Sequence, residues 1–352
     1  MDETRTQPKG SNNQEEKASL LARLKSPSVL AMLMFLGAVL GCLIMGSAVE
    51  EGALVLGIAW GNGFDMEFPI NWSRPVGSDI NEAVRWTTRE GEWLFDNMAY
   101  SIIMLIVYIK KGLTWVPWPA AILGISLLSY RMLGYKFGIF TLISLLLLAA
   151  FGMWEKAMET LAMIGTSVII SVAIALPIGI MAARNNLLDK ILQPILDMMQ
   201  TMPSFVYLVP AIMFFSLGNV PAVIATVVYA VPPAIRLTNL GIRQVDPEVV
   251  EAARSFGATN FQVLMKVQIP MAIPTIMAGI NQTIMMALAM VVIAALVGAG
   301  GVGEVVWRGL GRQRPGDALI GGVGIVIMAV LIDRLTQALA KSRQEALKGS
   351  GL

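Results

Sequence analysis

Long apolar segments, separated by short polar ones, make up most of the chain from residue 113 to residue 340. A helix needs about 20 mostly apolar residues to cross the hydrocarbon core of a bilayer, and several of these segments reach that length. We therefore predict an all-α, polytopic membrane protein with about eight transmembrane helices. The predicted spans comprise residues 29–49, 115–130, 137–153, 161–183, 199–217, 222–240, 273–297 and 318–340.

Basic residues in the connecting segments predict how these spans are oriented. Lysine and arginine are enriched on the cytoplasmic side of a membrane. Arg131 and Lys136 lie between the second and third spans, Arg184 follows the fourth, and Lys341 follows the last. Both ends of the chain are thus predicted to be cytoplasmic, and residues 298–317 to be on the outer side. The arginines that run against this trend are Arg308, Arg312 and Arg314.

The N-terminal part of the chain is the least apolar. Residues 80–93 mix charges with tryptophan, which predicts a helix in the membrane interface. Residues 97–109 are apolar but number only about 13, so we favour an interfacial helix there, with a true span as the alternative. The predicted parts of the chain are a disordered cytoplasmic tail (1–26), a transmembrane helix (27–49), a periplasmic and interfacial segment (50–112), accessory spans (113–160), the core (161–340) and a cytoplasmic tail (341–352).

Composition excludes several classes of protein. Hydrophobic residues make up 56% and charged residues 14% of the 352, against about a quarter charged in soluble proteins. The net charge of +2 is too small to indicate nucleic-acid binding. The single cysteine, Cys42, excludes an intrachain disulfide framework, and the chain has no histidine to serve as general base or metal ligand. It also has no phosphate-binding loop of the G-x-x-x-x-G-K-[ST] type, so any ATP chemistry must come from another chain, and we predict that this chain is not an enzyme.

Residues 246–270 are a polar-containing stretch between very apolar segments. Asp246 is a helix cap, and Pro247 stands at the first helical position, where its missing N–H costs nothing. Gly257 is suited to end that helix in a left-handed conformation. The stretch therefore begins with a short helix and a tight turn.

A second helix is predicted directly after that turn. Thr259 and Gln262 have the spacing of a capping box, and Pro270 is expected to end the helix. The basic residues Arg243 and Lys266 place the whole helix-turn-helix in the cytoplasm.

Within this stretch, Glu251-Ala252-Ala253 is followed after three residues by Gly257, and after nine more by Val267-Gln268-Ile269-Pro270. This spacing resembles the EAA loop of ABC importer permeases, with valine and isoleucine in place of that pattern's isoleucine and leucine. The resemblance implies that the loop docks in a cleft of a separate ATPase subunit. The small alanines permit close approach, and Phe256 is suited to fill a pocket. The residues expected to couple to the ATPase are Glu251, Ala252, Ala253, Phe256, Gly257, Val267, Ile269 and Pro270.

A longer resemblance covers residues 161–340. The passages LDMMQTMPSFVYLVPAIMFFSLGNVPAV, EAARSFGA, PTIMAGINQT and DRLTQALA are similar to permeases of glycine betaine and proline betaine importers, the ProW type. The resemblance implies a type I importer core of the MetI-like kind in a bacterial inner membrane. It also implies a homodimer of permeases, two cytoplasmic ATP-binding subunits that hold ATP and Mg, and a periplasmic substrate-binding protein. The substrates it implies are betaines, choline, carnitine or trimethylamine N-oxide.

Two groups of polar or aromatic residues inside the spans are candidates for the translocation path. Polar groups in a membrane are expensive unless they face a partner or a cavity, and proline frees a backbone carbonyl. Packing between helices is an equally good explanation of the first group, and hydrogen bonds across a dimer of the second. The candidates are Gln200, Thr201, Pro203, Phe205, Tyr207, Asn281, Gln282 and Thr283.

Two other interpretations concern the substrate and the energy source. Trp60, Trp72, Trp86 and Trp93 are candidates for an aromatic cage around a quaternary ammonium group, although an aromatic belt at the membrane surface explains them better. An ion-coupled secondary transporter or channel is the alternative function. That alternative predicts ionisable residues deep within the spans, which the sequence does not have.

Overall fold

The computed structural model describes residue 37 and residues 73–349. Two compact units divide the chain, Met1–Gly77 and Ser78–Leu352, and the features discussed below belong to the second. The predicted tail (1–26) and first span (27–49) lie outside the described residues, apart from residue 37. The helices are α3 (Ser73–Glu90), α4 (Glu92–Trp115), α5 (Trp118–Leu133), α6 (Tyr135–Ala150), α7 (Trp154–Arg184), α8 (Asn186–Thr201), the 3₁₀ turn η1 (Ser204–Tyr207), α9 (Leu208–Phe215), α10 (Asn219–Arg243), α11 (Pro247–Ser255), α12 (Asn260–Val263), the π-turn η2 (Leu264–Gln268), α13 (Ile269–Ala294), the 3₁₀ turn η3 (Ala295–Val297), α14 (Val302–Gly311) and α15 (Pro315–Gly349).

Five helices of the described residues are long and apolar enough to cross a membrane. They are α4, α7, α10, the continuous helix from Asn260 to Val297 that contains α13, and α15. A sixth candidate is the pair formed by α8 with η1 and α9, which is bent by 107°. The chain is therefore an all-helical, polytopic membrane protein, as the hydropathy pattern predicts.

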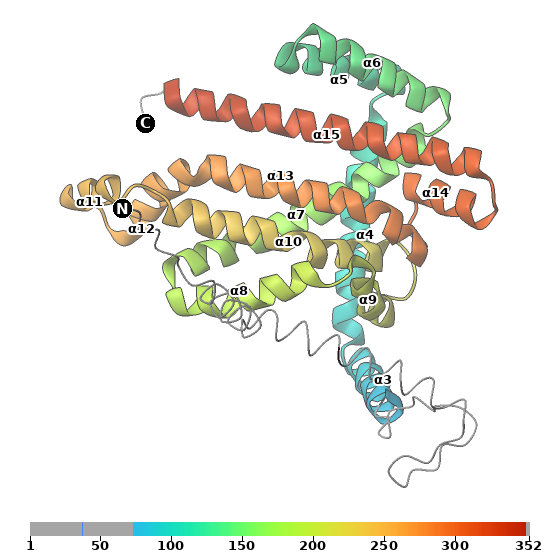
Figure 1. Cartoon of the computed structure of the whole chain (residues 1–352), viewed down its shortest axis with the longest axis horizontal. Coiled ribbons are helices and arrows are strands. Elements are labelled where there is room, and N and C mark those ends of the chain that lie inside the picture. Colours follow the sequence, from blue (N-terminus) through green and yellow to red (C-terminus); the bar gives the residue numbers. More distant parts are fainter. Residues whose placement is uncertain (1–36, 38–72, 350–352) are drawn as a thin grey trace, which may run out of the picture. The chain divides into compact units, whose positions relative to one another are not determined.

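The centre of the bundle is α10, which packs between α7 and α13. In its most apolar window 72% of α10 is buried within the chain, against 11% for α4. Glycines allow the close approach: a Cβ on Gly179 of α7 would lie 2.6 Å from the Cβ of Thr238 of α10, and one on Gly279 of α13 would lie 2.9 Å from that of Leu237. Figure 1 shows α10, α13 and α15 side by side, with α11 and α12 at one end.

The interfacial helix favoured at residues 97–109 rests on the short apolar run alone, and the helix that contains this run is longer. These residues are the middle of α4, whose 24 residues are enough for a span. The polar residues at both ends of α4, such as Glu92 and Lys110, extend the helix beyond the apolar run that the hydropathy pattern shows. Ile102 and Ile106, one turn apart, are buried in the bundle core.

The two helices in the region predicted to hold the accessory spans form a tight pair. α5 and α6 have 16 residues each and are shorter than the five helices that are long enough to cross a membrane. Gly134 joins them with φ +90°, a conformation that favours glycine. Gly138 lies against Tyr130 across the pair, where an added Cβ would come within 2.8 Å of the tyrosine Cβ. Trp115, the last residue of α4, and Trp118, the first residue of α5, are exposed, as tryptophans at a membrane surface are.

The predicted span over residues 199–217 is not one straight helix. α8 ends at Thr201, and Met202 is extended at ψ 137° because a residue before proline avoids the helical region. The chain then turns by 107° into η1 and α9. A predicted straight span is thus replaced by a broken one.

The predicted outer loop over residues 298–317 contains a helix. α14 occupies ten of its residues and begins immediately after Gly301, which has φ +93°. α14 packs against α15 and also contacts α7 and α13. The segment is therefore a structured part of the bundle and not an open loop.

Candidate functional site

The connection between α10 and α13 (residues 246–268, called the hairpin below) is exposed over most of its length. None of the residues of α11 is buried. Among the described helices, α11 makes extensive contacts only with α12 and η2, which form the second arm of the hairpin. Figure 1 shows α11 and α12 projecting at one end of α10 and α13. The hairpin therefore extends from the two helices most involved in the core.

Local hydrogen bonds determine where the first arm begins and ends. The side chain of Asp246 accepts a hydrogen bond from the Glu248 N–H at 2.9 Å, and Pro247 occupies the first turn, as predicted. At the other end, Gly257 N–H donates to Arg254 O at 2.9 Å and Ala258 N–H donates to Ala253 O at 3.1 Å. These two bonds with φ +85° at Gly257 are a Schellman motif.

The second arm begins as the sequence predicts but does not end at Pro270. The capping box is present: Thr259 N–H donates to Gln262 Oε1 at 2.8 Å, and Gln262 N–H donates to Thr259 Oγ1 at 3.3 Å. The helix then continues through Pro270 to Val297.

A π-turn explains why Pro270 fails to end the helix. Ile269 N–H donates to Leu264 O, five residues back, in the turn Leu264–Gln268. The wider turn displaces the carbonyls that would otherwise meet the proline ring, and π-turns are a known cause of helix distortion without termination. The second arm of the hairpin is consequently continuous with α13.

The eight predicted coupling residues divide into an exposed tip and a half-buried root. Phe256, at the tip, is 93% exposed, which is unusual for a phenylalanine outside a contact surface. Ile269, at the root, packs against a core cluster that includes Ile242 and Leu264. The tip residues are Glu251, Ala252, Ala253, Phe256 and Gly257, of which Ala253 is half-buried, and the root residues are Val267, Ile269 and Pro270.

Apolar side chains continue beyond Phe256 along the exposed side of the hairpin. Phe261 is 63% exposed and Met265 is 48% exposed. Charged neighbours such as Glu251 and Arg254 are exposed as well. This arrangement of exposed aromatic and Met residues with a charged rim resembles the composition of protein interfaces.

The structure gives different environments to the path candidates at the broken span. Gln200, Thr201 and Pro203 are exposed at the bend, and Phe205 is 58% exposed. Tyr207 is buried, and its hydroxyl donates to the carbonyl oxygen of Met199 across the bend. Tyr207 therefore stabilises the break, while the exposed residues stay candidates for the path.

The second group of path candidates has one member with a clear partner inside the chain. Asn281 Nδ2 donates to Asp333 Oδ1 at 3.3 Å, and Asn281 Oδ1 accepts from Thr336 at 2.6 Å. Asn281 thus joins α13 to α15. Thr283 is fully buried, and Gln282 is exposed.

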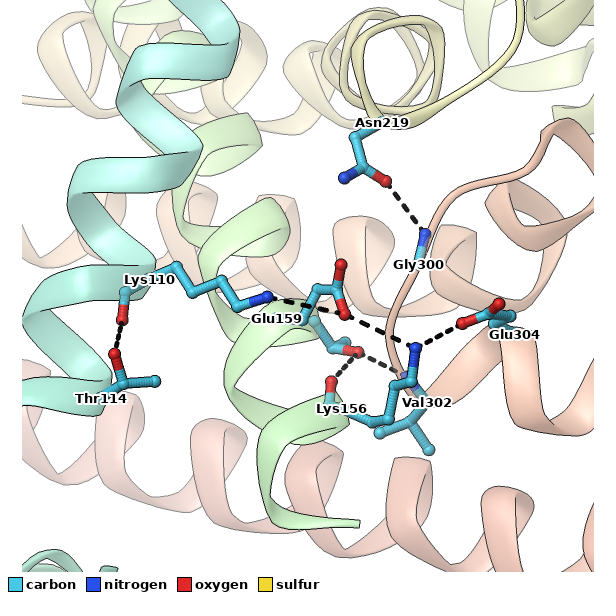
Figure 2. Close-up of polar contacts among 9 residues, drawn as sticks. Lys110, Thr114, Lys156, Glu159, Asn219, Gly300, Val302 and Glu304 are labelled. Atoms are coloured by element: carbon cyan, nitrogen blue, oxygen red, sulfur yellow. Dashed lines mark hydrogen bonds and ion pairs between the residues drawn. The ribbon is translucent and has the colours of Figure 1, made fainter. Parts of the chain in front are cut away.

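A network of charged residues far from the hairpin in sequence was not anticipated from the sequence. Lys156 Nζ lies 2.6 Å from Glu304 and 3.8 Å from Glu159, and Glu159 lies 3.9 Å from Lys110. Figure 2 shows these side chains converging from α4, α7 and α14. Arg308 adds a contact of 2.5 Å to Glu304, which gives one of the three unexplained arginines a partner. These five residues are called the α14 network below.

The glycine-rich segment before α14 is held in place by side chains of α7 and α10. Asn219 Oδ1 accepts a hydrogen bond from Gly300 N–H at 2.9 Å, and Thr160 Oγ1 accepts one from Val302 N–H at 2.9 Å (Figure 2). A Cβ on Gly300 would collide with Glu159. The only sequence signals for this arrangement are the helical spacings of Lys156 with Glu159 and of Glu304 with Arg308.

Comparison with known proteins decides the family. Residues 175–344 match the model of the family described as binding-protein-dependent transport system inner membrane component. The chain is 46% identical over 267 residues to the glycine betaine/proline betaine transport system permease protein ProW of Escherichia coli K12, covering 76% of this chain and 75% of that protein. The chain belongs to this family of inner-membrane permeases.

Other relatives agree with that assignment. The permease is 44% identical over 263 residues to the glycine betaine transport system permease protein OpuAB of Bacillus subtilis, covering 75% of this chain and 93% of that protein. A solved structure of the inward-facing MetNI methionine ABC transporter is similar with a TM-score of 0.50 at 24% identity, over 54% of this chain and 95% of that one. That likeness shows the shared fold, and the hairpin lies within the family-matched residues of the permease.

Proposed function

We propose that the permease is the transmembrane subunit of an ATP-driven importer for a small quaternary ammonium or methylamine solute, such as glycine betaine, choline, carnitine or trimethylamine N-oxide. The observation that carries this proposal is the 46% identity to a glycine betaine/proline betaine permease across three quarters of both chains. Relatives named for glycine betaine and carnitine and for trimethylamine N-oxide, at 46% and 38% identity, support the same class of solute.

The partners in this proposal are two cytoplasmic ATP-binding subunits, a second copy of the permease and a periplasmic substrate-binding protein. ATP and Mg bind to the ATP-binding subunits and not to this chain. The exposed tip of the hairpin supports this assignment, because an apolar side chain as exposed as Phe256 gains most by entering a partner's pocket. Ala252, one turn before Phe256, is exposed and has a small side chain, so a partner can approach the helix closely there.

The proposed cycle requires no chemistry in this chain. ATP brings the ATP-binding subunits together, and the hairpins that they hold move with them. Because the second arm is continuous with α13, that movement passes into the bundle and reopens the path outward. ATP shifts the permease between its inward-open and outward-open conformations only because the hairpin interacts differently with the two states of the ATP-binding subunits.

Reconstitution tests the proposal. The permease is placed in proteoliposomes with its ATP-binding subunit and its loaded binding protein, and uptake of labelled glycine betaine is measured with and without ATP. We expect uptake only with ATP and binding protein. Uptake that an ion gradient drives without ATP would contradict the proposal and favour an ion-coupled transporter.

The solute class is tested separately with the binding protein. Calorimetry with glycine betaine, choline, carnitine and trimethylamine N-oxide should show binding of one or more of them. Binding only of solutes that lack a quaternary ammonium or methylamine group would contradict the proposed class without affecting the assignment as a permease.

A further inference from the structure

Arg243, the last residue of α10, joins the hairpin to the two preceding helices. Its Nη2 donates to the carbonyl oxygen of Ala182 in α7 at 2.8 Å, and its Nη1 donates to Asn186 Oδ1 in α8 at 2.8 Å. The same guanidinium lies 3.5 Å from Asp189. Only Gln244 and Val245 separate Arg243 from the N-cap of α11.

Further polar contacts attach α8 to α10. Asn239 donates to Asp189 Oδ1 at 2.7 Å and accepts from Arg243 Nε at 2.8 Å. Arg236, which precedes Asn239 by one turn and Arg243 by two turns on α10, forms an ion pair with Asp197 near the end of α8. α8 is therefore held to α10 at both of its ends by charged side chains.

Apolar packing contributes to this attachment along one side of α8. Leu196 is buried against Val231, Ala234 and Ile235, and Leu192 and Met199 are partly buried against the same cluster. The polar residues just described line a cavity of about 330 Å³ beside α8. The position of α8 thus depends on these polar contacts together with the apolar contact around Leu196.

The position of α8 matters because α8 is the first half of the broken span. Its last residue, Thr201, precedes the 107° bend into η1 and α9, where the exposed path candidates lie. We propose that Arg243 is a positioning residue that passes displacement of the hairpin to α8, and through α8 to the bend. This proposal rests on the proposed function and adds a second connection beside the direct one through α13.

The chemistry of the site requires an arginine. A guanidinium presents five N–H donors in a fixed plane, and here they reach a carbonyl, two amide oxygens and a carboxylate on three helices. A lysine at this position keeps the charge but has one nitrogen, which cannot reach acceptors on three helices together.

The test compares Arg243→Lys and Arg243→Gln with the wild type in the complete transporter. The readout is the number of solute molecules imported per ATP hydrolysed, with co-purification of the ATP-binding subunit as the assembly check. Arg184→Gln is the control, since Arg184 is an exposed arginine at the end of α7 in the same region and makes none of these bonds. We expect both Arg243 variants to assemble and to lose roughly fivefold or more in solute imported per ATP.

An unchanged ratio of uptake to hydrolysis in both variants would overturn the proposal, even if both rates fall together, because a purely structural role lowers the amount of working transporter and not its coupling. If Arg243→Gln fails to insert, Arg243→Lys decides by the same ratio. Wild-type uptake that needs no ATP contradicts the proposed function and this proposal with it, and that result is seen before any variant is compared.

Discussion

The hairpin and the α14 network are both polar interruptions of an apolar chain, but they are built in different ways. The hairpin takes its shape from contacts within a few residues, such as the Asp246 cap and the Thr259–Gln262 capping box, and leaves Phe256 exposed. The α14 network takes its shape from contacts across the sequence, such as Lys156 with Glu304, 148 positions apart.

This difference indicates separate roles. A region whose shape is local and whose apolar side chains face outward is suited to bind another chain without first changing the bundle. A region whose charged groups are paired with each other across three helices is suited to fix the arrangement of those helices. Changes at the hairpin should therefore affect transport, and changes in the network should affect stability.

The largest effect is expected from a charge at the tip of the hairpin. Phe256→Asp should lower ATP-driven uptake at least tenfold, since burying an unpaired carboxylate in a partner's pocket costs several kcal/mol. The thermal stability of the isolated permease should stay unchanged, because the wild-type side chain is 93% exposed. Phe256→Leu is the control and should keep most of the uptake. Equal uptake in both variants would show that the tip does not enter a pocket.

A smaller effect is expected at the turn itself. Gly257→Ala places a Cβ on a residue with φ +85°, at a cost of roughly 1–2 kcal/mol. No neighbouring atom lies within 4 Å of that Cβ, so the cost is conformational and not steric. Protease cleavage within the hairpin should become faster, and uptake should fall. Gly316→Ala, which is equally open but has no positive φ, is the control and should change neither.

A change in the α14 network should lower the stability of the permease and not its coupling to ATP, the reverse of a change in the hairpin. Lys156→Met removes the cation between Glu159 and Glu304, and we expect about 1 kcal/mol of destabilisation, since both carboxylates are only partly exposed. The measurement is thermal unfolding of the isolated permease at low and high salt, and salt should reduce the difference from the wild type. Lys156→Met with wild-type stability but lost coupling would reverse the roles that we assign to the two regions.

The smallest effect on stability is expected at Asn281 and Gln282, two neighbouring side-chain amides of α13. Asn281→Ala removes hydrogen bonds to Asp333 and Thr336, which is expected to cost about 0.6 kcal/mol, the average for such bonds in membrane proteins. Gln282→Ala is the matched variant on the exposed neighbour and should leave stability unchanged. A change of apparent solute affinity in Gln282→Ala alone would support its place in the path, and such a change in Asn281→Ala alone would contradict the structural role of Asn281.

The sequence predicts those parts of the fold that depend on local physics. Hydropathy locates the long spans, and cap and turn residues locate both arms of the hairpin. Prediction from local sequence fails where neighbouring residues change the outcome that one residue or one apolar run indicates. Pro270 does not end its helix, because the π-turn ending at Gln268 accommodates it. The short apolar run at residues 97–109 likewise underestimates α4, because polar end residues extend the helix.

The rest of the site depends on contacts that no local pattern contains. Nothing in the sequence pairs Lys110 with Glu159, or Arg243 with Ala182 and Asn186, since each pairing requires the helices to be placed first. Pro203 does indicate a kink, but a proline alone does not specify a bend of 107°.

One cross-linking measurement tests the central claim most directly. Cys42 is the only cysteine of the chain, so Cys42→Ser with Phe256→Cys gives a single thiol at the tip of the hairpin. In the assembled transporter we expect that thiol to cross-link to the ATP-binding subunit and to resist a membrane-impermeant reagent added outside intact cells. Labelling of the thiol from outside, together with no cross-link to the ATP-binding subunit, would contradict the account.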